Sequence, residues 1–262
     1  MGIYLWDTSP SKIYVWWSEV ASVRAGDTKV RPSWPDKDYL CFTAEEAAST
    51  LKFIKQWSQA SLREFEISYD WTNWSAYTIW DTITLSNVWG KVYWRNSSET
   101  DTRLSTESSS YYYFQMTWTI WASWDIWFLL CKNSTNTITS YSFNNLFQNC
   151  SSLTSAPSLP ATTINTFCYR RMFRNCTNLI SLPKLPATAL KQSCYYSMFQ
   201  NCSNIKLSST QTWDYQTPYR IPTEWTWTTA TNWNTAMFSW TWWTFTSAPI
   251  INTTYYTSNT VV

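Results

Sequence analysis

Apolar and polar residues alternate along residues 64–69, which is the pattern of a β-strand with one buried face. The pair Asp70-Trp71 follows, and a second apolar run extends from Trp74 to Ile79. Two such runs around a short turn predict a β-hairpin. Further apolar runs predict strands at residues 83–88, 92–95, 112–116 and 126–131.

The stretch that precedes this hairpin carries two conflicting signals. Thr43 and Glu46 have the spacing of a helix capping box ahead of an alanine-rich stretch. Leu51 and Phe53, however, alternate with Lys52. The alternation favours a strand, because a helix would repeat its apolar residues at intervals of three and four positions.

The C-terminal half of the chain repeats itself at intervals of 26 residues. Phe143-Asn-Asn-Leu-Phe-Gln-Asn-Cys150 recurs as Tyr169-Arg-Arg-Met-Phe-Arg-Asn-Cys176 and as Tyr195-Tyr-Ser-Met-Phe-Gln-Asn-Cys202. Leu159-Pro-Ala-Thr162 recurs as Leu185-Pro-Ala-Thr188 at the same interval. A fixed period of this length is typical of a solenoid.

Each repeat predicts a short apolar strand, a turn led by proline and one apolar turn of helix. The helical turns are expected to end at Asn149, Asn175 and Asn201, because asparagine tolerates the left-handed conformation that closes a helix. A fourth, degenerate repeat aligns Met237-Phe238-Ser239-Trp240-Thr241 with Met198-Phe199-Gln200-Asn201-Cys202. Trp240 therefore takes the asparagine position.

The repeated apolar positions are predicted to form the core of this half of the chain. The residues chosen as its structural markers are Phe147, Cys150, Leu153, Cys168, Phe173, Cys176, Leu179, Cys194, Phe199 and Cys202. The same reasoning assigns to the core Leu146, Met172, Met198, Ile205, Leu159, Leu185, Ile164 and Leu190.

Tryptophan is abundant in this chain and glycine is scarce. The chain has 3 glycines and 21 tryptophans, whereas average usage gives about 18 glycines at this length. Tryptophan occurs where turns call for a positive φ, as at Trp34, Trp71, Trp89 and Trp240. We hypothesise that most of these positions are encoded by UGA codons that the source lineage reads as glycine. UGG codons at these positions would contradict the hypothesis.

The repeats resemble the BspA-like leucine-rich repeats of bacterial surface proteins, in which Met-Phe-x-Gly-Cys-Thr-x-Leu is usual. The resemblance covers residues 132–262 and departs from the family pattern in having asparagine for the motif glycine and an irregular insertion at 208–231. It implies a leucine-rich-repeat solenoid with an exposed binding surface. The expected fold class is α+β and β-rich, a small β-sandwich followed by that solenoid.

Three domains are expected. Residues 1–38 form a β arm with three short copies of one motif, the third at 23–30, and residues 39–131 form the β-sandwich. Residues 132–262 form the solenoid with its degenerate last repeat. No cofactor is expected, and no apolar run is long enough to span a membrane.

The composition argues against several kinds of chemistry. The chain has no histidine, which removes the commonest general base, and no enzyme class is indicated. A net charge of +2 predicts no nucleic-acid partner. The chain contains no Cys-x-x-Cys spacing, so the cysteines do not indicate a metal site. The carboxylates of Glu45, Glu46, Asp36 and Asp38 are interpreted as solvated surface groups.

Five of the seven cysteines recur at the 26-residue interval of the repeat. This recurrence favours buried free thiols, with disulfides between repeats as the alternative. Cys41 and Cys131, at the two ends of the expected β-sandwich, are a further candidate pair.

Aromatic residues are the remaining candidates for recognition. Tyr111-Tyr112-Tyr113 and Tyr255-Tyr256 could contribute to a binding surface, although packing in a half-buried strand is the favoured interpretation. If the tryptophans are genuine, the clusters Trp225/Trp227 and Trp240/Trp242/Trp243 suggest a carbohydrate-binding module. The favoured function is a non-enzymatic, extracellular or cell-surface adhesin that binds a protein or glycan on a host or neighbouring cell; the other alternative is a phage tail protein that recognises a host.

Overall fold

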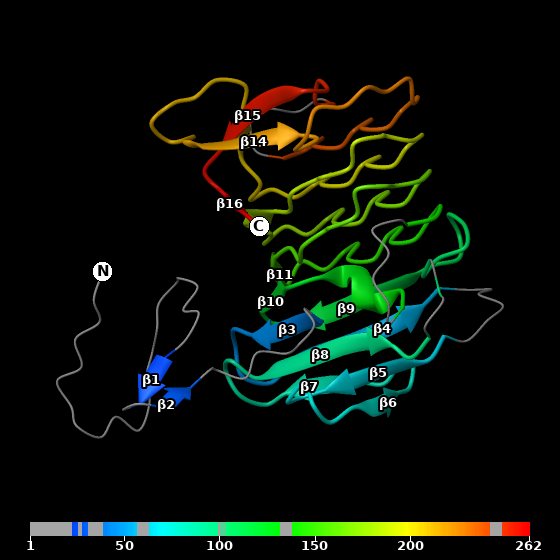
Figure 1. Ribbon diagram of the computed structural model, residues 1–262, viewed down its shortest axis with the longest axis vertical. Coiled ribbons are helices and arrows are strands. Elements are labelled where there is room, and N and C mark those ends of the chain that lie inside the picture. The colour runs from blue at the N-terminus through cyan, green and yellow to red at the C-terminus, as the bar shows by residue number, and fades with distance from the viewer. Residues whose placement is uncertain are drawn as a thin grey trace. The chain divides into compact units, whose positions relative to one another are not determined.

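The computed structural model describes residues 23–25, 28–30, 39–56, 63–98, 101, 103–131, 138–241 and 248–262. The chain forms two compact units, Met1–Asp36 and Lys37–Val262 (Figure 1). In the first unit β1 (Val23–Ala25) pairs antiparallel with β2 (Thr28–Val30). This hairpin is the third copy of the predicted arm motif, and the first two copies lie outside the described residues.

Two sheets organise the N-terminal part of the second unit. The larger has the order β11-β10-β3-β8-β5-β6, and the smaller has the order β7-β4-β9. The larger sheet comprises β3 (Leu40–Ala44), β5 (Phe65–Ser68), β6 (Ser75–Tyr77), β8 (Lys91–Asn96), β10 (Ile120–Ser123) and β11 (Leu153–Ser155). The smaller comprises β4 (Ser49–Lys55), β7 (Ile83–Leu85) and β9 (Tyr112–Thr117).

The hairpin predicted around Asp70 is confirmed. β5 and β6 pair antiparallel, with Phe65 opposite Tyr77. The loop between them is ordered by the Asp70 carboxylate, which accepts hydrogen bonds from the backbone amides of Thr72 (3.0 Å) and Asn73 (2.8 Å). These bonds stabilise the ionised form and hold the pKa of Asp70 far below its usual value.

The strand interpretation of the stretch around Leu51 is also confirmed, because Leu51 and Phe53 on β4 are fully buried. The strand predicted at 126–131 is wrong: Ile126–Leu129 form a short 3-10 helix, η1. Asp125 caps this helix by accepting a hydrogen bond from the backbone amide of Trp127. All four helical residues are buried. The continuous apolar run in the sequence therefore indicated burial correctly, but it did not indicate an extended backbone.

The repeated asparagines lie in runs of consecutive turns, and we call residues 141–149, 167–175, 193–201 and 232–240 the first to fourth turn segments. The first, fifth and ninth residue of every segment has a positive φ. In the first segment these residues are Tyr141, Asn145 and Asn149. A left-handed residue at every fourth position stops helix propagation, so the predicted helical turns do not form.

The turn segments stack on one another (Figure 1), and backbone hydrogen bonds join each segment to the next. The amide of Phe147 donates to the carbonyl of Met172 (2.9 Å), and that of Phe199 donates to the carbonyl of Met237 (2.8 Å). The phenylalanine rings stack in register, from Phe147–Phe173 at 5.5 Å to Phe199–Phe238 at 5.2 Å between centroids. The alignment of the fourth repeat with the third is therefore confirmed.

The expected fold class, a β-sandwich followed by a leucine-rich-repeat solenoid, is wrong. The second unit is β-rich, its strands are divided among several small sheets, and no α-helix occurs among the described residues. The strands of successive repeats do not pair with one another: β11 pairs with β10, β12 (Ser181–Leu182) with β16 (Thr260–Val261), and β13 (Leu207–Ser208) with β15 (Thr253–Thr257). The remaining strand, β14 (Thr217–Ile221), also pairs with β15.

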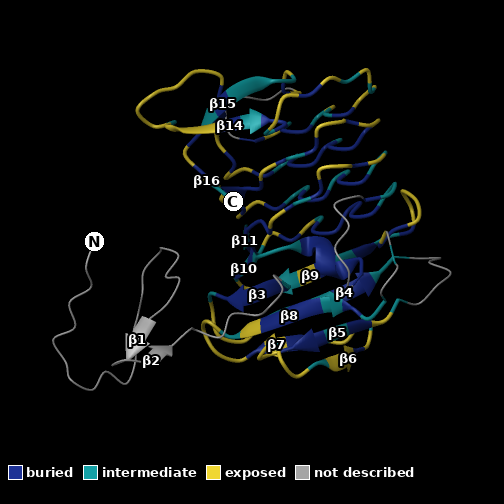
Figure 2. Cartoon of the chain, in the orientation of Figure 1, coloured by how far each residue is buried: buried dark blue, intermediate teal, exposed yellow. Residues whose placement is uncertain are grey.

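A single hydrophobic core runs through the second unit from Leu40 to Tyr255. Its buried residues lie both on the strands and on the turn segments (Figure 2). Phe42 of β3 packs on Phe114 of β9 at 4.8 Å, and Phe114 stacks on Phe147 of the first turn segment at 5.4 Å between ring centroids. The position between residues 131 and 132, where a domain boundary was expected, lies inside this unit.

Six of the tryptophans in the described part of the chain have a positive φ: Trp71 (57°), Trp80 (83°), Trp89 (68°), Trp118 (59°), Trp124 (64°) and Trp240 (63°). None of them is buried. Trp240 matches Asn149 (67°), Asn175 (64°) and Asn201 (62°), the equivalent residues of the other turn segments. Tryptophan thus occupies a backbone region that glycine adopts freely and that asparagine tolerates better than a bulky aromatic residue does.

Candidate functional site

A polar groove of about 510 Å³ opens between the outer faces of β4 and β9 and the first turn segment. Strands β4 and β9 supply one wall, and Gln148 and Asn149 of the turn segment supply the other. Its described lining residues are Thr50, Lys52, Gln56, Tyr111, Tyr113, Gln115, Met116, Thr117, Gln148 and Asn149.

Strand alternation places the polar side chains in this groove. On β9, Tyr112 and Phe114 are buried, whereas Tyr113 and Gln115 between and beyond them face outwards. The antiparallel register sets Lys52 of β4 opposite Gln115. The wall of the groove is therefore the solvent side of a strand pair whose other side builds the core.

Two aromatic rings and Met116 form the apolar part of the groove. Tyr111 and Tyr113 are half-buried, and their ring centroids lie 5.7 Å apart. Partial burial raises the pKa of Tyr113 above its ordinary value, so its hydroxyl stays protonated and can donate as well as accept a hydrogen bond. Tyrosine rings beside amides and hydroxyls can stack on a flat apolar face and hydrogen-bond to its polar substituents.

The groove lacks the groups that most reactions require. Its described lining residues include no carboxylate and no thiol, and the chain has no histidine. Glu45 instead accepts a hydrogen bond from Thr154 (2.7 Å), and Glu46 accepts one from Thr119. The arrangement can hold a polar ligand through amides, hydroxyls and one ammonium group, but it contains no general acid or base of ordinary pKa near neutrality.

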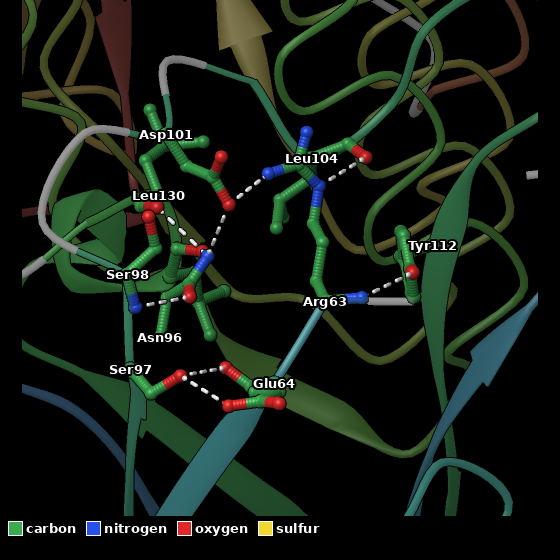
Figure 3. A network of polar contacts seen from close by, with 10 residues as sticks. Arg63, Glu64, Asn96, Ser97, Ser98, Asp101, Leu104, Tyr112 and Leu130 are labelled. Atoms are coloured by element: carbon green, nitrogen blue, oxygen red, sulfur yellow. Dashed lines mark hydrogen bonds and ion pairs between the residues drawn. The ribbon is translucent and has the colours of Figure 1, made fainter. Parts of the chain in front are cut away.

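A second cluster of polar side chains lies at one end of the strands and is structural (Figure 3). Arg63 forms an ion pair with Asp101, and its Nε donates to the carbonyl of Leu104 (3.3 Å). The fully buried Asn96 donates to Asp101 (3.1 Å) and to the carbonyl of Leu130 (2.8 Å). This network connects the segment after β8 to the end of η1, and its polar groups form hydrogen bonds and an ion pair with one another.

The ten repeat residues chosen from the sequence lie at the centre of the molecule. Each of them is at most 2% exposed, so they build the core and offer no open surface. All seven cysteines are buried free thiols, as the repeat favoured, and Cys41 and Cys131 form no disulfide. The thiols of Cys150, Cys176 and Cys202 each donate to a backbone carbonyl, at 2.9–3.0 Å. Burial raises the pKa of Cys194 to about 12.

Sequence reasoning found only part of the groove. It singled out Tyr111-Tyr112-Tyr113, of which the first and third line the groove and the second is buried. It missed Lys52, Gln115 and Gln148, which read as ordinary surface residues. No local pattern could have joined these three, because their proximity depends on the register of β4 with β9 and on the packing of the first turn segment beside β9.

The exposed tryptophan clusters lie elsewhere. Trp225 and Trp227 are 72% and 91% exposed, and the Arg220 guanidinium lies 5.5 Å from the Trp225 ring centroid. Trp240 is also exposed, and Trp242 and Trp243 lie outside the described residues. None of these tryptophans is among the described residues that line the groove.

A scan against protein-family models, a search of curated proteins and a search of solved structures each found no match for this chain. Within the described residues, no helix has the length and apolar character needed to cross a membrane.

Proposed function

We propose that this chain is a non-enzymatic, adhesin-like binding protein, exposed on a cell surface or secreted, and that its groove binds a glycan. The observation that carries this proposal is the lining of the groove: two neighbouring tyrosines among amides, hydroxyls and one lysine. A sugar ring presents one apolar face and a rim of hydroxyls, which fits such a surface.

The proposal does not depend on the tryptophans. A carbohydrate-binding surface built on Trp225 and Trp227 would disappear if those residues were glycine in the natural protein. The groove uses Tyr111 and Tyr113 for stacking, and none of its described lining residues is tryptophan. The Ser-, Thr-, Asn- and Tyr-rich composition supports a surface location, since it resembles that of exposed bacterial β-rich proteins.

The test is binding of the purified chain to a glycan panel that contains neutral and acidic members. Tyr113→Ala and Gln148→Ala should each weaken binding about tenfold or more, since each removes a side chain that lines the groove. Tyr69→Ala is the matched control, because Tyr69 is 59% exposed and lies outside the groove. Binding that survives both groove substitutions, or binding to no glycan, would refute the proposal.

A further inference from the structure

The two halves of the chain have opposite charge. Residues 1–131 carry fifteen carboxylates and eleven basic side chains, whereas residues 132–262 carry eight basic side chains and only two carboxylates, Asp214 and Glu224. Three of the eight basic residues, Arg170, Arg171 and Arg174, lie together on the second turn segment. The small net charge of the whole chain conceals this local excess of positive charge.

The three arginines lie on the outer side of their segment. Burial along it has a period of four: Cys168 and Tyr169 are buried, Arg170 and Arg171 are partly exposed, and the pattern then repeats to Arg174. The arginines form no ion pair with a described residue. One guanidinium nitrogen of each is shielded from solvent and has no hydrogen-bond partner among the described residues.

The arginines affect one another and a neighbouring ring. Burial, together with the charges of Arg171 and Arg174, lowers the pKa of Arg170. The guanidinium carbons of Arg170 and Arg171 lie 5.7 and 5.9 Å from the ring centroid of Tyr196 on the third turn segment. Like charges held together with unsatisfied donors are stabilised when an anion binds between them.

This patch continues the groove. Gln148 lines the groove, and Arg174 holds the equivalent position on the next turn segment. The amide of Asn149 donates to the carbonyl of Arg174 at 2.8 Å, and the Asn175 side chain donates to the Asn149 side chain at 2.6 Å. A ligand chain that leaves the groove past Gln148 and Asn149 therefore reaches Arg174 first, and Arg171 and Arg170 precede it on the same turn segment.

We infer that the ligand is an acidic glycan with carboxylate-bearing sugars, whose rings lie against Tyr111 and Tyr113 and whose carboxylates bind Arg170, Arg171 and Arg174. This inference rests on the proposed glycan-binding function and adds the chemical class of the ligand. Arginine suits the role because its planar fork of donors matches the two oxygens of a carboxylate.

The experiment measures binding of the full chain to polygalacturonate and a sialylated oligosaccharide, and to the same two ligands with their carboxylates methyl-esterified. The acidic forms should bind at least about tenfold more tightly, and added salt should reduce the difference. The triple variant R170Q/R171Q/R174Q should abolish the preference. The control K184Q/K191Q/K206Q removes three exposed charges from the same half and should retain it.

The possible outcomes separate the two proposals. Equal binding of esterified and acidic forms, sensitive to Tyr113→Ala, would leave glycan binding intact and overturn the acidic preference. Binding of neither form of either ligand would overturn the acidic-glycan inference, and absence of binding across the whole neutral and acidic panel would overturn glycan binding as well. Polyglutamate that binds as tightly as polygalacturonate would show an acidic protein partner instead. A melting temperature for the triple variant close to that of the control shows that it is folded.

A second inference rests independently on the backbone. The structure assigns glycine, in the natural protein, to the six tryptophan positions with positive φ, and tryptophan to Trp94 and Trp127. The latter two are at most 1% exposed, pack in the core and have no positive φ. A bulky aromatic residue at positive φ is a conformational outlier, whereas glycine adopts that region freely.

Sequencing of the coding DNA and peptide mass spectrometry of the protein from its source organism test this assignment. UGA codons and glycine-containing peptides are expected at positions 71, 80, 89, 118, 124 and 240, with UGG codons and tryptophan-containing peptides at 94 and 127. UGG codons at the six positions would overturn the assignment, as would tryptophan found there in the mature protein.

Discussion

At the scale of single residues, backbone conformation separates the tryptophans into two groups. Trp94 contacts the rings of Phe53 (5.6 Å), Tyr77 (4.6 Å) and Phe114 (5.3 Å) between centroids, and is fully buried. Trp118 is 60% exposed and has a positive φ. The first side chain contributes apolar burial to the core, whereas the second sits on a strained turn and contributes little.

Substitution by glycine should therefore have opposite effects in the two groups. Trp71→Gly, Trp118→Gly and Trp240→Gly should each raise the free energy of unfolding by about 1 kcal/mol. Each substitution removes the cost of about 1–2 kcal/mol that a non-glycine residue pays in the left-handed region. The greater freedom of glycine in the unfolded chain offsets part of this gain. Trp94→Gly should lower it by about 4 kcal/mol or more through loss of core packing. Urea unfolding measures both, and destabilisation by all three turn substitutions would contradict the interpretation.

At the scale of the elements, the turn segments owe their shape to regularly spaced left-handed residues and their stacking to repetition. The side chains of Asn149, Asn175 and Asn201 extend this repetition as a ladder, with Asn175 donating to Asn149 at 2.6 Å and Asn201 donating to Asn175 at 2.7 Å. The asparagine thus serves both the backbone conformation and the contact between segments.

Two substitutions at Asn175 separate these roles. Asn175→Gly keeps the positive φ and removes the ladder bonds, so it should lower the free energy of unfolding by about 1 kcal/mol. Asn175→Ala removes both and should lower it by about 2 kcal/mol. Denaturant unfolding of the two variants side by side gives the comparison, and an alanine variant as stable as the glycine variant would rule out a conformational role.

Prediction from sequence worked best for elements whose signal is local. The alternation around Leu51 and the run before Asp70 marked β4 and β5, because side-chain period reports strand geometry directly. The apolar repeats were correctly assigned to the core but wrongly to helical turns, because burial at Phe147 or Phe173 does not distinguish a helix from consecutive turns. At Ile126–Leu129 the same ambiguity misled the strand prediction.

At the scale of the whole second unit, the strands and the turn segments share one core. β10 pairs in parallel with β11, which joins a residue of the N-terminal half, Ile120, to Leu153. The amide of Phe114 donates to the carbonyl of Leu146 at 2.9 Å, and the thiol of Cys150 donates to the carbonyl of Phe114 at 3.0 Å. Neither the N-terminal strands nor the turn segments can bury their apolar side without the other.

A fragment of residues 39–131 should consequently fail to fold. It would expose the apolar faces that now pack on the first turn segment, including those of Phe42 and Phe114. Near-ultraviolet circular dichroism should show no fixed aromatic packing in this fragment, whereas residues 37–262 should give a native spectrum and one cooperative unfolding transition. A native-like, cooperatively unfolding 39–131 fragment would contradict a shared core.

The buried thiols and phenols should also make the unit sensitive to alkali. Burial raises the pKa of Cys194 to about 12, and burial also raises that of Tyr77 to about 12. Their unfolded values are about 8.5 and 10, so above those values the unfolded chain has lost protons that the folded chain retains. The contribution of these groups to the free energy of unfolding is therefore fully present below about pH 8.5, and it falls as the pH rises towards 12.

Urea unfolding at about pH 8 and about pH 10.5 should show this loss, by about 1.4 kcal/mol per pH unit for each buried thiol above its unfolded pKa. Cys194→Ala is the control, and its stability should depend less on pH over the same interval. A free energy of unfolding that is constant from pH 8 to about 10.5 would contradict full burial of the thiols.

The sequence by itself determined which positions repeat, which of them are buried, and that the closing residue of each repeated segment is left-handed. These properties follow from the short-range periodicity of side-chain size and polarity, so they can be read without knowing what packs against what. Tertiary structure decided that β11, β12 and β13 enter three different sheets and that Lys52, Tyr113 and Gln148 meet in one groove. Those outcomes depend on pairing between residues far apart in the chain, where many registers satisfy the same local pattern.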